Sequence, residues 1–438
     1  LPMTRTVHYN SRHTISPRCS MPDGSLPRRD FLGLGVGLAT AALAGPRATL
    51  GANERIGLGV IGCGVRGTYI LGEALAAAPG RIQLVGLCDV WSQAREKLAA
   101  SVADKLPGQK PRLVARYDDL LATPGLDAVI IATPDHAHCA VLMAAVQAGK
   151  DAYVEKPLTA RLEDAIKAQD LVKASNRIVQ VGTQRRSVPR FQAAKEYVKS
   201  GALGDICKIE TAWNRNVASW ARPFDMCKES EVDWEQYQMY LPKRAWDPMR
   251  YRRWQCFYDY TTGLVGLLGS HMIDVALWFM EDPFPSSAVA LGRTLTWKDG
   301  RDISDTAEYV FEFPKGWMLT FSSRLGSGPE SDFEVFYGKT RTLDSRDWTS
   351  RAADNTRPQD AKDFVLPAPP KASAGSLTAG DAGPHVANWI ECLASRKQPN
   401  APIDVGYAHA VACCLGREAE RTGRRMRYDV ANRKIVEA

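Results

Sequence analysis

The stretch that most restricts how this chain can fold is an apolar run that enters a glycine pattern. Residues 56–61 have strand character, and Gly62, Gly64 and Gly67 follow in a Gly-x-Gly-x-x-Gly turn that leads into a helical segment. One glycine of such a turn allows the tight bend, one lets the backbone approach a pyrophosphate, and one allows close packing of the helix. The helix then begins with free N–H groups that can face phosphates. This order predicts a dinucleotide-binding βα unit.

A carboxylate stands where such a unit needs one. The next strand-like run, residues 82–87, leads to Asp89, which is placed to accept hydrogen bonds from the ribose hydroxyls of a dinucleotide. A carboxylate there also repels a 2′-phosphate, and the one nearby cation, Arg95, is a turn into the next helix. The sequence therefore predicts NAD as the cofactor, with NADP possible.

From residue 53 to about 200, strand and helix patterns alternate. Strands are expected at 55–61, 82–88, 113–117, 127–132, 151–155 and 178–181, and helices at 66–78, 92–104, 136–148, 160–175 and 189–200. Such alternation is typical of a parallel sheet with right-handed crossovers. We expect an α/β chain whose N-terminal Rossmann domain covers residues 51–182.

Beyond about residue 205 the pattern changes. Strands are expected at 206–213, 286–297, 306–313, 317–324 and 332–337, helices at 264–280, 384–395 and 406–421, and a long loop at 350–382. Strands joined by turns indicate a mostly antiparallel sheet. The predicted second domain, residues 183–438, is thus an α+β domain built on a mostly antiparallel sheet.

The first 50 residues have the features of an export signal. Arg28 and Arg29 precede a glycine-rich, weakly apolar segment that ends in small residues at Ala42 and Ala44. This arrangement resembles a twin-arginine (Tat) signal with cleavage near Ala44, which predicts export of a folded protein to the periplasm. A basic tail followed by a short core helix is the alternative.

Charge and hydropathy argue against several classes of partner. The formal net charge is only +7, and no dense basic run contains interleaved aromatics, so no nucleic acid is expected. The longest apolar stretch, near residues 31–44, is too short to cross a bilayer comfortably, so no membrane span is expected after cleavage. His136 and His138 do not share a helix face, which argues against a metal site.

Two further strand ends carry polar groups. The fourth strand runs into residues 133–138, and the fifth ends in Glu155, Lys156 and Pro157. Ligands of open α/β sheets bind beyond the carboxyl ends of the strands, so these groups should face the same crevice as the glycine turn. A lysine there can donate to a substrate hydroxyl and stabilise a developing alkoxide. Thr133 or a neighbouring residue also suits the simpler role of helix cap.

Five segments of the sequence carry a family resemblance. They read VIGCGVRG, ATPDHAH, EKPLT, VGTQRRS and GSHMIDVALWF, and together they resemble the Gfo/Idh/MocA oxidoreductases along nearly the whole chain after residue 54. The resemblance implies a Rossmann domain plus an open-sheet domain, sugar or polyol substrates, and homo-dimers or homo-tetramers. It also implies that Lys156 of the EKP motif and His271 of the second domain are the catalytic residues.

One position departs from that pattern. Many members carry an aspartate four residues before the histidine, where this chain has Leu267. A histidine alone can still act as a base near neutral pH. Tyr258 or Tyr260 is a candidate to replace the missing carboxylate.

These arguments give two sets of expected site residues. The cofactor set is Gly62, Gly64, Val65, Arg66, Gly67, Asp89, Thr133, Pro134, His136, Glu155 and Lys156. The substrate set is Gln184, Arg186, Trp213, Asn214, Arg253, Tyr260, His271 and Asp274. Aromatic faces and bidentate donors among them suit a pyranose ring, although a strand end and a structural charge cluster explain several equally well.

The function expected from these features is an NAD(P)-dependent oxidoreductase that transfers hydride between a sugar or polyol hydroxyl and a tightly bound nicotinamide. One alternative is a glycosidase or lyase that uses bound NAD in a redox-neutral cycle of oxidation, elimination and re-reduction. A sugar-binding protein without activity is a third, which the presence of both Lys156 and His271 disfavours.

Overall fold

The computed structural model describes residues 55–353, 362–366 and 382–438, which belong to one structural unit. The signal expected over residues 1–50 lies outside the described residues, as does most of the loop expected at 350–382. None of the helices in the described part of the chain has the length and apolar character of a membrane span.

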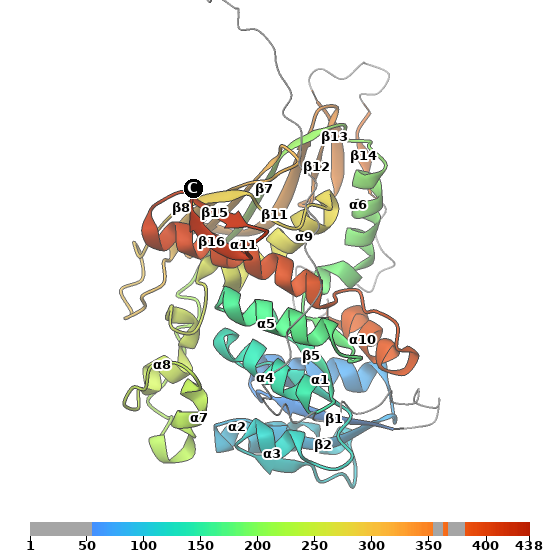
Figure 1. Ribbon diagram of the computed structural model, residues 1–438, viewed down its shortest axis with the longest axis vertical. Coiled ribbons are helices and arrows are strands. Elements are labelled where there is room, and N and C mark those ends of the chain that lie inside the picture. The colour runs from blue at the N-terminus through green and yellow to red at the C-terminus, as the bar shows by residue number, and fades with distance from the viewer. Residues whose placement is uncertain (1–54, 354–361, 367–381) are drawn as a thin grey trace, which may run out of the picture. The chain divides into compact units, whose positions relative to one another are not determined.

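The first sheet is six-stranded and wholly parallel, in the order β3-β2-β1-β4-β5-β6. Three of its strands, β1, β2 and β5, are labelled in the lower part of Figure 1. Its strands are β1 (Ile56–Ile61), β2 (Ile82–Cys88), β3 (Arg112–Val114), β4 (Ala128–Ile131), β5 (Asp151–Val154) and β6 (Val179–Val181). The intervening helices are α1 (Val65–Ala77), α2 (Ser92–Val102), α3 (Tyr117–Leu121), α4 (Asp135–Gln147) and α5 (Leu162–Lys173). Every residue of β1 and β4 is buried, as expected of strands covered on both faces. The Rossmann prediction is confirmed.

A helix from near the end of the chain completes this first layer. Helix α10 (Gly383–Ser395) places Val386, Trp389 and Ile390 in the apolar cluster that also holds Ile70 of α1. The first sheet is therefore covered partly by residues far away in sequence, which pattern reading alone did not anticipate.

The second sheet has ten strands in the order β14-β13-β12-β11-β7-β10-β9-β8-β15-β16. They are β7 (Ile206–Asn216), β8 (Ser287–Arg293), β9 (Thr306–Glu312), β10 (Met318–Arg324), β11 (Gly326–Gly338), β12 (Arg341–Asp344), β13 (Thr349–Ala352), β14 (Phe364–Val365), β15 (Met426–Asp429) and β16 (Lys434–Glu437). Only the β7–β10 pair is parallel among the pairings described. The predicted mostly antiparallel sheet is confirmed.

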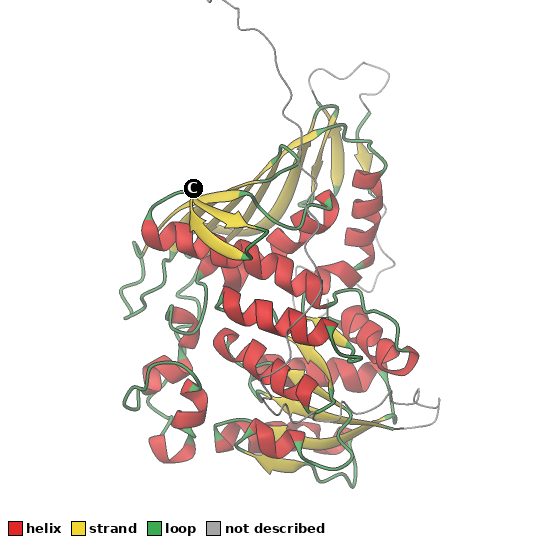
Figure 2. Ribbon diagram, in the orientation of Figure 1, coloured by secondary structure: helices red, strands yellow, loops and turns green. Residues whose placement is uncertain are grey.

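Helices cover one face of this sheet, as Figure 2 shows. They are α6 (Pro189–Lys199), α9 (Ser270–Met280) and α11 (Ile403–Thr422). The helix expected over 264–280 is split, because a π-helical turn at Val265–Gly269 precedes α9. π-turns insert an extra residue into a helix and often mark functional sites.

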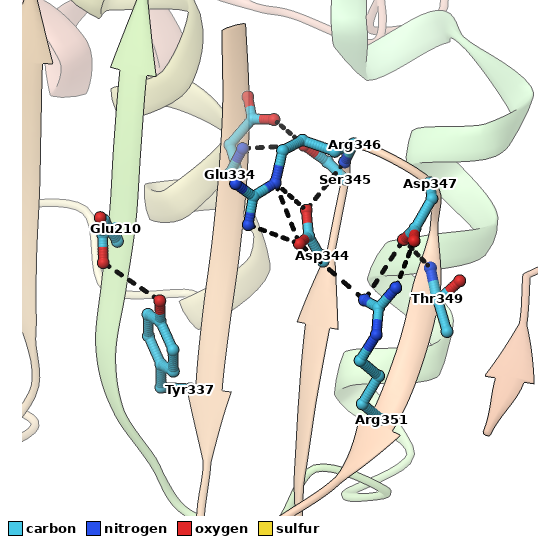
Figure 3. Close-up of polar contacts among 9 residues, drawn as sticks. All are labelled: Glu210, Glu334, Tyr337, Asp344, Ser345, Arg346, Asp347, Thr349 and Arg351. Carbon is cyan, nitrogen blue, oxygen red and sulfur yellow. Dashed lines mark hydrogen bonds and ion pairs between the residues drawn. The ribbon is translucent and has the colours of Figure 1, made fainter. Parts of the chain in front are cut away.

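Polar contacts join β7, β11 and the end of β12 in the second sheet (Figure 3). The Tyr337 hydroxyl donates to Glu210 at 3.1 Å, and the Ser345 hydroxyl donates to Glu334 at 2.9 Å. Strands β12, β13, β15 and β16 have four residues each, with charged residues among them, and β14 has only two residues, so the apolar pattern did not predict these strands.

A segment rich in aromatic residues separates β7 from the π-turn. It contains α7 (Trp234–Gln238), α8 (Pro248–Arg252) and a small apolar cluster of Trp234, Tyr237, Cys256, Phe257 and Tyr260. This segment packs against the ends of β2 and β4, next to the cavity described below.

Candidate active site

A cavity of about 770 Å³ lies beyond the carboxyl ends of the parallel strands, where open α/β sheets bind ligands. Residues of both predicted sets line it, namely Gly62, Gly64, Val65, Arg66, Asp89, Thr133, Pro134, His136, Glu155, Lys156, Gln184, Trp213 and His271. The fold thus brings the three predicted strand ends and the second domain's histidine to one cavity.

The glycines of the turn have separate tasks. Gly62 has a φ of +96°, and a Cβ there would lie 2.5 Å from the carbonyl oxygen of Ala132. A Cβ on Gly67 would lie 1.9 Å from the carbonyl oxygen of Gly62, so Gly67 permits helix packing and is not part of the cavity lining. A Cβ on Gly64 would meet nothing within 4 Å, which leaves open space beside the backbone.

Asp89 lies at the end of β2 and lines the cavity. Its carboxylate accepts hydrogen bonds from the backbone N–H of Cys63 at 2.7 Å and of Trp91 at 2.9 Å. Burial raises the pKa of Asp89, while these N–H groups and the Tyr251 hydroxyl oppose the shift. The carboxylate is therefore fixed against the glycine turn.

The end of β4 presents Thr133, Asp135 and His136 to the cavity. The Thr261 hydroxyl donates to Asp135 at 2.7 Å, and burial raises the pKa of this carboxyl to about 7. The Nε2–H of His136 donates to the carbonyl of Tyr237 at 2.9 Å, and burial lowers the pKa of His136 to about 4. His136 is therefore a neutral, structural residue of the cavity wall.

The end of β5 contributes two charged groups. Glu155 is buried and accepts from Arg66 at 2.8 Å and from Gln184 at 3.1 Å. The Lys156 ammonium donates to the backbone carbonyl of Leu267 at 2.8 Å. Burial lowers the pKa of Lys156, although the charges of Glu155 and Asp135 act in the opposite direction.

His271 enters the cavity from α9. Its ring centre lies 5.5 Å from that of Trp213 on β7, and burial followed by the positive charge of Lys156 holds its pKa well below the ordinary value. The imidazole is neutral at physiological pH and can accept a proton. A neutral base beside an ammonium is an arrangement suited to proton transfer at a substrate hydroxyl.

The structure corrects the expected replacements for the missing carboxylate. The Tyr258 hydroxyl donates to Glu420 at 2.9 Å, and neither Tyr258 nor Tyr260 lines the cavity. Among the carboxylates that line it, Glu155 and Asp135 act by charge on Lys156, and Asp135 comes from the end of β4.

Four other predicted substrate residues also lie outside the cavity lining. Arg186 and Asp274 form an ion pair at 2.9 Å, so the charged groups of both side chains bind to each other within the second domain. Asn214 donates to the Ser331 hydroxyl at 3.2 Å, and Arg253 donates to the carbonyl of Arg222 at 2.7 Å. Sequence position alone did not show which way these side chains turn.

The 3₁₀ turn Gln184–Ser187 explains one of these corrections. It turns Arg185 rather than Arg186 toward the cavity, where the buried guanidinium forms ion pairs with Glu334 and, at 3.3 Å, with Asp332. Other cavity residues outside both predicted sets are Asp135 and His138, from the segment 133–138 that was expected at this crevice, together with Trp220, Arg222, Gln236, Tyr237, Tyr251, Arg252, Trp254 and Gln255. The density of aromatics and arginines between residues 213 and 260 was the available signal.

Comparison with known proteins fits this geometry. Residues 56–183 match the family described as "Oxidoreductase family, NAD-binding Rossmann fold", and residues 231–343 match the GFO/IDH/MocA C-terminal domain. The chain belongs to the GFO/IDH/MocA oxidoreductase family. Residues 56–183 are accordingly the family's NAD-binding domain.

Individual GFO/IDH/MocA relatives match over part of their length. The chain is 34% identical over 145 residues to scyllo-inositol 2-dehydrogenase (NAD(+)) of Bacillus subtilis, covering 33% of this chain and 40% of the relative. It is 32% identical over 117 residues to levoglucosan dehydrogenase of Pseudarthrobacter phenanthrenivorans, covering 27% and 30%. The matches thus span less than half the length of these relatives.

Solved structures share the fold over most of the chain. A levoglucosan dehydrogenase complex with NADH superposes with a TM-score of 0.66 at 18% identity, covering 85% of this chain and 98% of that one. The WlbA dehydrogenase from Bordetella pertussis, in complex with NADH and UDP-GlcNAcA, gives 0.63 at 20% identity, covering 86% and 100%. At these identities the likeness establishes the fold.

The residues present fit an NAD molecule. Two buried hydroxyls of the cavity, those of Thr133 and Tyr237, have no hydrogen-bond partner within the described residues, as expected where a ligand supplies one. Gly64 leaves space beside the turn, and Asp89 stands ready for ribose hydroxyls. No group of three or more His, Cys, Asp or Glu side chains suited to a metal ion occurs in the described ranges.

Proposed function

We propose that the protein is an NAD-dependent oxidoreductase that acts on a secondary hydroxyl of a sugar or polyol. The observation that carries this proposal is the meeting of Lys156 and His271 in the cavity lined by the glycine turn. The names of the relatives support the substrate class, because they include inositol and levoglucosan dehydrogenases.

The chain's own residues supply the acid–base chemistry. Bound NAD would supply the acceptor for the hydride that leaves the carbon bearing the hydroxyl. Neutral His271 takes the hydroxyl proton, and the Lys156 ammonium stabilises the negative charge that develops on that oxygen. Trp213, packed beside His271, offers an aromatic face to the sugar ring.

A substrate screen tests this proposal. Sugars, inositols, anhydrosugars and aryl glycosides are incubated with the purified protein, and both NADH and organic products are measured. Oxidation of a polyol with stoichiometric NADH supports the proposal. Cleavage of aryl glycosides without net NADH would instead identify the redox-neutral cycle, and binding of sugars without any product would identify a binding protein.

We also propose that the chain is exported by the twin-arginine pathway to the periplasm. The pair Arg28-Arg29 before a weakly apolar segment supports it. Expression with Arg28→Lys and Arg29→Lys should retain the protein in the cytoplasm, whereas unchanged fractionation of this double variant would refute the proposal.

For the assembly we propose a homo-dimer or homo-tetramer joined through the open sheet. The apolar side chains Val289 and Leu291 of β8 and Met318 of β10 are exposed, and exposed apolar groups gathered on a sheet suit an interface. Light scattering of the purified protein tests this, and a monomer at micromolar concentration would refute it.

A further inference from the structure

Residues 229–260 of the second domain are attached to the Rossmann domain at the end of β2, and we call this segment the strap. Val232 forms an isolated antiparallel bridge with Trp91. The indole N–H of Trp91 donates to the carboxylate of Glu231 at 3.3 Å, and the Gln93 amide donates to the same carboxylate at 2.8 Å. One end of the strap is thus held by backbone and side-chain contacts just after Asp89.

The strap is held a second time at the end of β4. The His136 ring donates to the carbonyl of Tyr237 at 2.9 Å, and the Tyr240 hydroxyl donates to the carbonyl of His136 at 2.7 Å. The backbone N–H of His136 donates to the carbonyl of Tyr260 at 3.1 Å. A single residue of the Rossmann domain therefore has contacts with three positions along the strap.

The glycine turn lies between these two attachments. In the first sheet β1 is hydrogen-bonded to β2 on one side and to β4 on the other, so a segment fixed at the ends of β2 and β4 crosses the end of β1. Tyr237 lies on this crossing, because Val232, five residues before it, is bridged to Trp91 and its own carbonyl accepts from His136.

Tyr237 has the features of a ligand contact. It lines the cavity and is 5% exposed, and its hydroxyl has no hydrogen-bond partner within the described residues. An unpaired buried hydroxyl is destabilising, and a bound ligand that accepts its hydrogen bond would relieve that cost. Tyr251, from the same strap, also lines the cavity and packs edge-on against Trp91 with ring centres 6.2 Å apart.

We propose that the strap closes over the bound dinucleotide at the glycine turn, with the Tyr237 hydroxyl as a direct hydrogen-bond donor, so that the cofactor is released slowly. This inference rests on the proposed function for its ligand. It assigns cofactor binding to residues of the second domain that lie outside the glycine motif. Release of the dinucleotide then requires the contacts around Trp91 or His136 to open.

The test measures NADH dissociation from the full chain, by the fluorescence change when excess NAD displaces bound NADH, with no substrate present. Glu231→Ala removes the acceptor of Trp91 and Gln93, and dissociation should become at least about tenfold faster. Tyr237→Phe removes only the hydroxyl and should weaken NADH affinity about three- to tenfold, the usual range for one hydrogen bond. Asp225→Ala, an equal charge change at an exposed carboxylate that precedes the strap, is the control and should match wild type.

If both variants released NADH within twofold of the wild-type rate, with unchanged melting temperatures, the proposal that the strap closes over the dinucleotide would be overturned. The proposed oxidoreductase fails in a different way. Slow, strap-dependent NADH release without oxidation of any polyol would contradict the activity alone. Polyol oxidation by a protein whose variants release NADH at the wild-type rate would contradict the strap alone.

Discussion

The Lys156 ammonium and the Leu267 carbonyl form a 2.8 Å hydrogen bond that joins the Rossmann domain to the helix carrying His271. Leu267 lies in the π-helical turn Val265–Gly269, directly before α9. A backbone carbonyl thus orients the lysine in a chain that lacks the aspartate found at this position in many members of its family. The lysine and histidine are held together without that carboxylate.

Removal of either group should abolish most of the activity. Lys156→Met and His271→Gln should each lower kcat by roughly 10²–10⁴-fold, the usual range for a positioned acid–base group. Folding should survive, because each side chain is only partly buried and borders the cavity. Steady-state kinetics and circular dichroism check this, with Lys167→Met on the exposed face of α5 as control. Near-normal turnover of either variant would show that its assigned role is wrong.

Asp135 should control the pH dependence. Its pKa of about 7 lies above the ordinary value, so the carboxyl is protonated below pH 7 and charged above it. The charged carboxylate of Asp135 stabilises the ammonium form of Lys156. Glu155 and Arg66 are the other charged groups that face this ammonium, and the Thr261 hydroxyl donates a hydrogen bond to Asp135. We therefore expect kcat/KM to rise from pH 6 to pH 8 through an ionisation near 7.

Asp135→Asn keeps the shape of the side chain. This variant should lose the rise in kcat/KM between pH 6 and pH 8, and its kcat/KM should be lower than that of wild type. Asp118→Asn, an exposed carboxylate in the first turn of α3, is the matched control and should keep the wild-type profile. If Asp135→Asn kept the rise in kcat/KM between pH 6 and pH 8, another group would be responsible for that ionisation.

Much of this arrangement followed from the sequence, for reasons that particular residues illustrate. Gly62 and Lys156 were found because strand ends in a parallel sheet must meet at one edge, whatever the details of packing. The fold class was predictable because apolar periodicity differs between the two halves. His271 was found by family resemblance and not by spacing.

The errors have an equally local origin. Arg185 and Arg186 are neighbours, and only the 3₁₀ turn decides which one faces the cavity. Tyr237 reaches the cavity through a segment with little regular periodicity, so no pattern placed it. Asp135 belongs to the segment expected at the crevice, with a helix cap as the alternative, and its burial next to Lys156 becomes visible only in three dimensions.

The buried ion pair between Arg185 and Glu334 should stabilise the second domain and shape the cavity. Glu334→Gln removes the buried negative charge that faces Arg185, and the free energy of unfolding should fall by about 3–5 kcal/mol. Denaturant titration measures this, with Glu308→Gln as the control because Glu308 is an exposed carboxylate on β9 of the same sheet. A loss below about 1 kcal/mol would contradict a stabilising role for the pair.

Asp89 should set the preference for NAD. Its carboxylate is held by Cys63 and Trp91 next to the glycine turn, where a 2′-phosphate would meet its negative charge. Wild-type protein should bind NADH at least about tenfold more tightly than NADPH. Asp89→Asn should lower this ratio of affinities, because the variant loses hydrogen bonds to NADH and no longer repels the 2′-phosphate of NADPH. Fluorescence titration with both cofactors decides, and tighter NADPH binding by wild type would contradict the assignment.

The central claim is that one cavity holds NAD together with a polyol whose hydroxyl faces Lys156 and His271. The most direct measurement adds candidate polyols to protein saturated with NAD and records the NADH absorbance formed in a single turnover. The account predicts about one NADH per active site for at least one inositol or sugar with wild-type protein, and a rate at least about a hundredfold lower with Lys156→Met. Equal rates for the two proteins, or no NADH from any polyol despite saturating NAD, would contradict it.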